Sequence, residues 1–326
     1  MAELGVVLLN LGGPETLDDV EPYLRNLFED PYVIELPWFV RWLRKPLARR
    51  IAKGRAPASK ENYRKIGGGS PINRFTTLQA NALEAELVRR GLSAKVVFAQ
   101  RAWKPRAETA VTALAEAGIE RGVMLPLYPQ YARATTKSAF EDFEEAWAAK
   151  GTPGVSWKRV RSYPAERRYI EAIAADIRTT LENVPAERRA TTALFFSAHG
   201  LPVKAAKNPE ETYPAEVRQT VDAVLAALAW SGRWHLGFQS RVGPLTWLEP
   251  YTEAVIETMV EEKTTDAVVY PVAFVSDHSE TLYELDMEYG DIARAKGLGW
   301  HRVPALNDRP LFIAALADLV ERALGT

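Results

Sequence analysis

The chain has 326 residues, of which 47% are hydrophobic and 25% charged, as in a soluble globular protein with room for two domains. Its net charge of −1 and the lack of a long basic run argue against nucleic acid as the main partner. Because it has no cysteine, disulfides, cysteine-ligated zinc sites and iron–sulfur clusters are all excluded.

The first ten residues predict a strand, because they lack the basic segment and long apolar run of a signal peptide. The sequence contains no stretch of about 18 apolar residues, so no transmembrane helix is predicted. We therefore expect a cytoplasmic protein.

Eight short apolar runs, most of them continuous, predict strands that are covered on both faces. In chain order they are Gly5–Asn10, Ala94–Ala99, Gly122–Leu127, Ser156–Val160, Ala193–Ser197, His235–Phe238, Ala267–Tyr270 and Trp300–Val303. The predicted helices are Thr77–Arg90, Arg106–Ala117, Lys137–Lys150, Ala165–Leu181, Ala215–Trp230, Tyr251–Glu262, Ser279–Lys296 and Pro310–Ala323. Strands that alternate with helices predict an α/β fold with parallel sheets and right-handed crossovers.

The two halves resemble each other at the ends of their strands. The third strands end in Leu125–Pro129 and Tyr270–Phe274, and the fourth in Val160–Pro164 and Val303–Asn307. We therefore expect a duplicated four-stranded domain, with residues 1–163 forming the first copy and 164–326 the second. The last helix is expected to pack back on the first domain. Ligands of such sheets bind beyond the carboxyl ends of the strands.

The first half carries an insertion, from about residue 12 to 73, between its first two strands. Within it, Leu36–Leu47 mixes tryptophans with arginines and a lysine. This composition fits a segment that lies in a membrane interface or closes over an apolar ligand. The alternative is an ordinary amphipathic helix packed on the body. The sequence thus leaves open a peripheral contact with the inner face of the membrane.

A stripe of acidic residues follows the seventh strand. Asp277 comes just after the strand, and Glu280, Glu284 and Glu288 are spaced to stack along one face of a helix. No lysine or arginine lies between Asp277 and Glu288, although like charges at this spacing repel. The stripe suggests a path for cations or protons. The alternative is a solvated helix face, with Asp277 as a helix cap.

His199 follows the apolar strand Ala193–Phe196, beside Gly200. This position suits proton transfer or metal contact, although a single histidine is more often structural. Ser197 does not indicate a serine hydrolase, because the G-x-S-x-G motif is absent. The glycines of Gly67–Ser70 lack the lysine of a P-loop, so a tight turn is the simpler interpretation.

Six segments in this order together resemble the ferrochelatase family, whose members insert ferrous iron into a porphyrin to make haem. They are Leu9–Glu15, Tyr63–Ile72, Tyr128–Tyr131, Ser197–Pro202, Gln239–Pro244 and Ser276–Asp286. One departure is Ala102, where the family often has an aromatic residue, and this puts any role of that side chain in doubt.

The resemblance implies two Rossmann-like, chelatase-type domains with the porphyrin in the cleft between them. It implies His199 and Glu280 as the catalytic and metal-site residues, and Asp277, Glu284 and Glu288 as an acidic path. It also implies a π-helical stretch around Asp277–Asp286. The porphyrin-binding positions that it implies are Arg55, Tyr63, Ser70, Arg101 and Trp247.

The activity implied is a lyase reaction: Fe(2+) enters protoporphyrin IX, two protons leave, and protohaem forms in the terminal step of haem biosynthesis. We hypothesise His199 as proton acceptor and Glu280 as metal ligand or proton relay. No cofactor is expected beyond the substrate iron. One alternative is a coproporphyrin III ferrochelatase, although the Trp-rich insertion favours the more apolar protoporphyrin. Another is a non-catalytic tetrapyrrole or metal carrier, which would need no base beside the metal. A chelatase for sirohydrochlorin is less favoured, because its many carboxylates would call for a more basic site.

Overall fold

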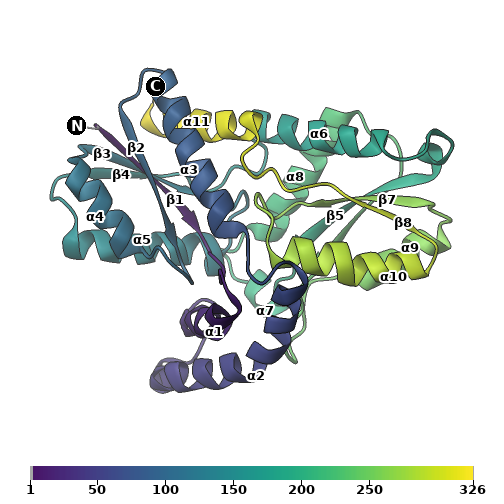
Figure 1. Cartoon of the computed structure of the whole chain (residues 1–326), viewed down its shortest axis with the longest axis horizontal. Coiled ribbons are helices and arrows are strands. Elements are labelled where there is room, and N and C mark those ends of the chain that lie inside the picture. The colour runs from purple at the N-terminus through teal and green to yellow at the C-terminus, as the bar shows by residue number, and fades with distance from the viewer. Residues whose placement is uncertain (1–2, 326) are drawn as a thin grey trace. The chain divides into compact units, whose positions relative to one another are not determined.

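The structure, a computed structural model, describes residues 3–325 and alternates strands with helices along the chain (Figure 1). It divides into two compact units. The first comprises the chain up to Ser162 together with the segment from Ile313 on, and the second is Tyr163–Phe312. The boundary falls inside the last helix, α11 (Pro310–Leu324).

The first unit is built on a four-stranded parallel sheet with the strand order β2-β1-β3-β4. Its strands are β1 (Leu4–Asn10), β2 (Ala94–Gln100), β3 (Arg121–Pro126) and β4 (Ser156–Arg159). Every residue of β1 is buried, because this central strand is covered on both faces of the sheet. Its helices include α3 (Ile72–Arg89), α4 (Ala107–Ala117) and α5 (Ser138–Lys150).

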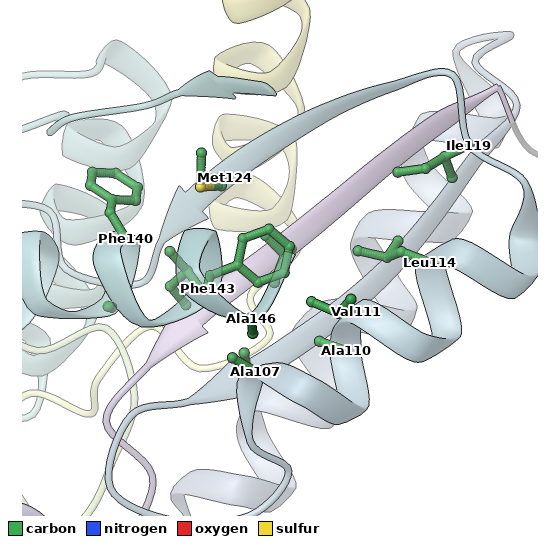
Figure 2. Close-up of a cluster of buried hydrophobic side chains, with 13 residues drawn as sticks. Ala107, Ala110, Val111, Leu114, Ile119, Met124, Phe140, Phe143 and Ala146 are labelled. Atoms are coloured by element: carbon green, nitrogen blue, oxygen red, sulfur yellow. The ribbon is translucent and has the colours of Figure 1, made fainter. Parts of the chain in front are cut away.

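A hydrophobic core fills the space between the sheet and the helices α4 and α5. Figure 2 shows Val111 and Leu114 of α4 near Phe143 of α5, with Met124 contributed by β3. Aromatic side chains extend this core, since the Phe143 ring lies edge-on to Trp157 with centroids 4.8 Å apart. Apolar burial therefore joins helix and sheet at this face, and Arg159 of β4 adds an ion pair with Glu144 of α5.

The insertion folds as a pair of helices, α1 (Val20–Glu29) and α2 (Arg44–Lys65), with a 3₁₀-helix, Trp38–Leu43, before α2. Large side chains of α1, including Tyr23 and Phe28, share a core with alanines that recur every fourth residue along α2. The 3₁₀-helix does not use its aromatic side chains for packing on the body.

The helix after the insertion begins at Ile72, five residues earlier than the predicted start at Thr77. Pro71 immediately precedes it, and proline suits the first turn of a helix because its missing N–H has no partner there. The first turn was not predicted because the polar residues Asn73 and Arg74 interrupt its apolar pattern.

The second unit repeats the same sheet, with the order β6-β5-β7-β8 and parallel pairing throughout. Its strands are β5 (Thr192–His199), β6 (Trp234–Gln239), β7 (Asp266–Pro271) and β8 (Gly299–Arg302). Its helices include α6 (Arg167–Glu182), α7 (Val203–Ala206), α8 (Tyr213–Leu228), α9 (Thr252–Glu261) and α10 (Gly290–Ala295). The predicted α/β class and the duplicated four-stranded sheet are confirmed.

The predicted helix Ser279–Lys296 is two elements: a π-helix, Glu280–Tyr289, and then α10. The π-helical stretch implied by the family resemblance is therefore present, whereas the uniform α-helix predicted from residue pattern is wrong. A second π-helical turn, Arg133–Lys137, precedes α5 and was not predicted. Both arise from i→i+5 hydrogen bonding, which the pattern of apolar residues does not distinguish from an α-helix.

Candidate functional site

His199 is the last residue of β5, the strand at which the order of the second sheet reverses. In such sheets ligands bind beyond the carboxyl ends of the strands, at the point where the strand order reverses. The Tyr213 hydroxyl donates a hydrogen bond to the His199 carbonyl oxygen at 2.9 Å. The fold thus fixes the backbone of His199 while 41% of its side chain stays exposed.

Glu280, at the start of the π-helix, forms an ion pair with this histidine. The distance from His199 Nδ1 to Glu280 Oε2 is 2.8 Å. Burial favours the neutral imidazole, but the charge and hydrogen bond of Glu280 raise the pKa of His199. Burial likewise opposes ionisation of Glu280, yet the charge of His199 and its hydrogen bond lower the pKa of Glu280 to about 2. The pair therefore stabilises an imidazolium beside a carboxylate.

Glu284 lies further along the π-helix, and its pKa is raised, whereas that of Glu280 is lowered. Burial, and then repulsion from Glu280, raise its pKa to about 7. The Ser240 hydroxyl and the Gln239 amide donate to Glu284 Oε2 at 2.6 and 3.2 Å. Glu288 follows on the same helix and is exposed. The three glutamates thus extend from the His199–Glu280 pair to the exposed Glu288, and the pKa of the middle carboxyl, Glu284, is about 7.

Asp277, which is expected to belong to the acidic path, is paired within the fold. It is buried, 2.8 Å from the Arg302 guanidinium and 2.9 Å from the Asn307 amide nitrogen. The Thr281 hydroxyl also donates to it, at 2.9 Å. The positive charge that balances Asp277 is that of Arg302 in β8. Arg302 lies outside Asp277–Glu288, the segment that contains no lysine or arginine.

Two aromatic rings complete the surroundings of the pair. Phe274 lies edge-on to His199 and to His278, with ring centroids 6.2 and 4.4 Å away. The Glu280 backbone N–H donates to His278 Nδ1 at 3.2 Å. Burial lowers the pKa of His278, which keeps this nitrogen available as an acceptor. The sequence predicted no role for Phe274, Gln239 or Ser240. Gln239 and Ser240 nevertheless lie in Gln239–Pro244, one of the segments that resemble the ferrochelatase family.

Trp247 packs over the loop that follows His199. Its backbone forms an antiparallel bridge with Pro202, and its ring lies against Gly200. A Cβ at Gly200 would be 2.6 Å from the Gln239 carbonyl oxygen and 3.1 Å from the Trp247 ring, so only glycine fits. The buried indole Nε1 of Trp247 has no hydrogen-bond partner within residues 3–325. Such a donor suits a ligand.

The other expected porphyrin-binding residues belong to the first unit. Arg101 is only 16% exposed and lies 2.9 Å from Asp30 and 3.2 Å from Asp142, so its charge is balanced internally. Ser70 is buried, and its hydroxyl lies 3.4 Å from the Ile72 backbone nitrogen.

Three further residues of this unit differ in exposure. Arg55 is exposed, 5.6 Å from the centre of the Phe28 ring, whereas Tyr63 is buried in the core of the insertion. Ala102 is also buried there, and its carbonyl oxygen accepts a hydrogen bond from Asn26.

Among residues 3–325, no three side chains of His, Asp or Glu converge in a way that could hold a metal ion. His199 and Glu280 carry an imidazole and a carboxylate, both of which are donors that iron(II) accepts. No helix in the described part of the chain has the length and apolar character needed to span a bilayer.

A sequence model of the ferrochelatase family matches residues 3–324. The chain belongs to the ferrochelatase family. The ferrochelatase of Cyanothece sp. is 43% identical over 326 residues, covering 99% of this chain and 83% of the relative. That of Synechococcus elongatus is equally 43% identical with the same coverage. Membership of the ferrochelatase family makes the chain a metal chelatase, a lyase of haem and porphyrin biosynthesis.

Two solved structures have the same fold. SirB from Bacillus subtilis, determined with Fe3+, has a TM-score of 0.53 at 10% identity, covering 99% of this chain and 96% of SirB. CbiX, the terminal enzyme of sirohaem biosynthesis in denitrifying bacteria, has a TM-score of 0.50 at 14% identity, covering 98% of this chain and 99% of CbiX. At these identities the likeness to the ferrochelatase chain is one of fold alone.

Proposed function

We propose that this protein inserts Fe(2+) into protoporphyrin IX, releases two protons and forms protohaem, the terminal step of haem biosynthesis. The observation that carries the proposal is the His199–Glu280 pair, 2.8 Å apart, with Glu284 close to it. Metallation requires a base for the pyrrole protons and donors for the metal, and this pair offers both. Iron is a substrate here, and we propose that no resident cofactor or iron–sulfur cluster is needed.

His199 is the proposed proton acceptor. With its Nδ1 hydrogen-bonded to Glu280, the lone pair of the neutral ring lies on Nε2. When Nε2 takes a pyrrole proton, the resulting imidazolium is stabilised by the ionised Glu280 beside it. Glu284 and then the exposed Glu288 offer acceptors toward solvent, and the pKa of Glu284 near 7 suits a group that both takes and releases protons.

The porphyrin must bend before a metal can reach its nitrogens, at a strain of roughly 1–5 kcal/mol drawn from contacts with its periphery. We propose that Trp247 supplies an aromatic contact for the ring, since its indole is fixed over Gly200. Arg55, Tyr63, Ser70 and Arg101 remain proposed porphyrin-binding residues. Of the two arginines, Arg55 is the more exposed and is the one proposed to bind a propionate.

The decisive test is anaerobic Fe(2+) insertion by the purified protein, with protoporphyrin IX and coproporphyrin III side by side. Faster turnover of protoporphyrin IX is expected. Preference for coproporphyrin III would keep the chemistry and overturn the choice of substrate. Binding of both without turnover would favour a tetrapyrrole carrier. His199→Ala is expected to lower the rate by about 10²–10⁴-fold, as for loss of a general base, and a wild-type rate would refute its role.

We also propose a cytoplasmic protein that makes a peripheral contact with the inner face of the membrane. The support is the exposure of Trp38, Phe39 and Trp42, which are 79%, 61% and 74% accessible. Lys45 and Arg49 of α2 are exposed nearby in the sequence, and such bases attract anionic lipids. Sedimentation with anionic vesicles at low salt is expected to carry down the wild type and less of a Trp38→Ser/Trp42→Ser variant. Equal recovery of both proteins in the supernatant would contradict the contact.

A further inference from the structure

Ser240 occupies a backbone conformation that serine rarely adopts. It follows β6 directly, and its φ is +63°, in the left-handed region. A Cβ is unfavourable there, so glycine is the ordinary choice at such a position. The backbone alone would therefore favour a glycine here, and the presence of a side chain calls for a reason beyond the turn.

The reason lies in where the hydroxyl points. Ser240 Oγ is 2.6 Å from Glu284 Oε2 and 3.3 Å from Glu280 Oε2. A hydroxyl has one proton and donates it to one carboxylate at a time. The shorter distance selects Glu284, and the hydroxyl thus sits between two carboxylates that repel each other.

Neighbouring residues hold this hydroxyl and its partner in place. The Ser197 hydroxyl donates to Gln239 Oε1 at 2.6 Å, which turns the Gln239 amide nitrogen toward the Glu280 carbonyl oxygen and Glu284 Oε2. Two consecutive residues therefore donate to one oxygen of Glu284.

We propose that Ser240 is a positioning residue for metal insertion: its hydroxyl keeps the Glu284 carboxylate beside Glu280, from which like charge would otherwise drive it toward solvent. The inference rests on the proposed chelatase function and deepens it. It explains why a strained serine stands where glycine would be the more stable residue.

Two substitutions distinguish the effect of the Ser240 hydroxyl from the effect of its left-handed backbone conformation. Ser240→Gly removes the hydroxyl and relieves the left-handed strain, whereas Ser240→Ala removes the hydroxyl and keeps the strain. Both are expected to lower kcat/KM for Fe(2+) by about tenfold, the effect of one charge-assisted hydrogen bond, with KM for the porphyrin unchanged. Ser240→Gly is expected to melt roughly 2–4 °C above Ser240→Ala. Activity would thus follow the hydroxyl, and the melting temperature would follow the backbone.

Ala229→Gly is the matched control, because Ala229 also has a left-handed φ, +49°, and is exposed at the end of α8. It is expected to keep wild-type activity. Wild-type turnover by Ser240→Gly, or a loss that falls equally on the porphyrin KM, would overturn the proposal. If the wild-type protein itself inserts no iron, the proposed function fails instead, so the two failures are distinguishable.

Discussion

His199 and Glu280 ionise as a linked pair, and their contribution to stability depends on pH in a definite direction. The folded pKa of His199 is raised above 6.5, so its contribution is complete below pH 6.5 and is lost as pH rises through that folded value. The folded pKa of Glu280 is lowered from 4.5 to about 2, so its contribution is complete above pH 4.5 and is lost as pH falls toward 2. The pair therefore stabilises the fold most between about pH 4.5 and 6.5.

We expect Glu280→Gln to destabilise the protein more at pH 5.5 than at pH 9. At the alkaline pH the imidazolium has lost its charge, and the variant also relieves the repulsion between Glu280 and Glu284. Melting temperatures of wild type and variant, measured from pH 5 to 9, would show a difference that shrinks as pH rises. The control is Glu257→Gln, which breaks an exposed ion pair with Lys296, 2.7 Å away. A difference for Glu280→Gln that stays constant with pH would contradict the linkage.

At the scale of elements, the π-helix is anchored by a cation from β8. Arg302, only 10% exposed, binds Asp277 just before the π-helix at 2.8 Å and Asp286 within it at 2.5 Å. A π-helix is rare and is usually found where function requires it. The two ion pairs tie the segment before the π-helix and the second half of the π-helix to β8, the edge strand of the sheet, and so hold Glu280 and Glu284 in their places.

Arg302→Met is expected to cost about 3–5 kcal/mol of unfolding free energy, because it leaves Asp277 buried without its counter-charge. The iron-insertion rate is expected to fall as well, since the π-helix carries Glu280 and Glu284, the carboxylates proposed to act in metal insertion. Urea unfolding and the insertion assay measure the two effects. Arg167→Met breaks an exposed pair with Glu171 and is expected to stay within about 1 kcal/mol of wild type. Equal effects of the two variants would argue against the anchor.

The same elements show how far sequence pattern reaches. Apolar runs located the eight strands that residues 3–325 form. In central strands such as β1 and β7, burial on both faces leaves a signal in the run itself, whereas the edge strands β4 and β8 are only partly buried. The acidic stripe and His199 were found because charge beside a buried strand is unusual. Arg302 was missed as the partner of Asp277, because 25 residues separate them and only the pairing of β8 with β7 brings them together. The π-helix followed from the family resemblance and not from periodicity.

At the scale of the whole molecule, the two units place equivalent residues at the ends of their central strands. In the first sheet Asn10 pairs with Gln100, and in the second His199 pairs with Gln239. In the first unit the amide of Asn10 donates to Thr76 at 3.0 Å, and that of Gln100 to Asn73 at 3.2 Å. A network of neutral amides thus fills the position that carries the histidine in the second unit. The same fold occurs twice, and the proposed proton acceptor, His199, lies in the second copy.

The first unit includes a segment from the other end of the chain, and its stability should depend on that segment. From Ile313 onward, α11 buries Leu316 and Val320 completely and Ile313 and Leu319 almost so. Arg90 of the α3 C-cap binds Asp318 at 2.7 Å, Glu321 at 2.6 Å and the Ala314 carbonyl oxygen at 3.2 Å. Burial of four such side chains is worth roughly 6–12 kcal/mol, which is comparable to the whole stability of a domain.

A chain that ends at Phe312 is therefore expected to lose the fold of the first unit and to keep that of the second, whose own contact between Phe312 and Tyr169 is retained. Hydrogen exchange would show this directly: amides of β1 would lose protection, and amides of β5 would keep it. A chain that ends at Leu324 is the control, because it retains all the buried residues named above, and both strands should stay protected. Protection of β1 in the shorter chain would mean that the first sheet is stable without α11, and that the helix serves another purpose than completing this core.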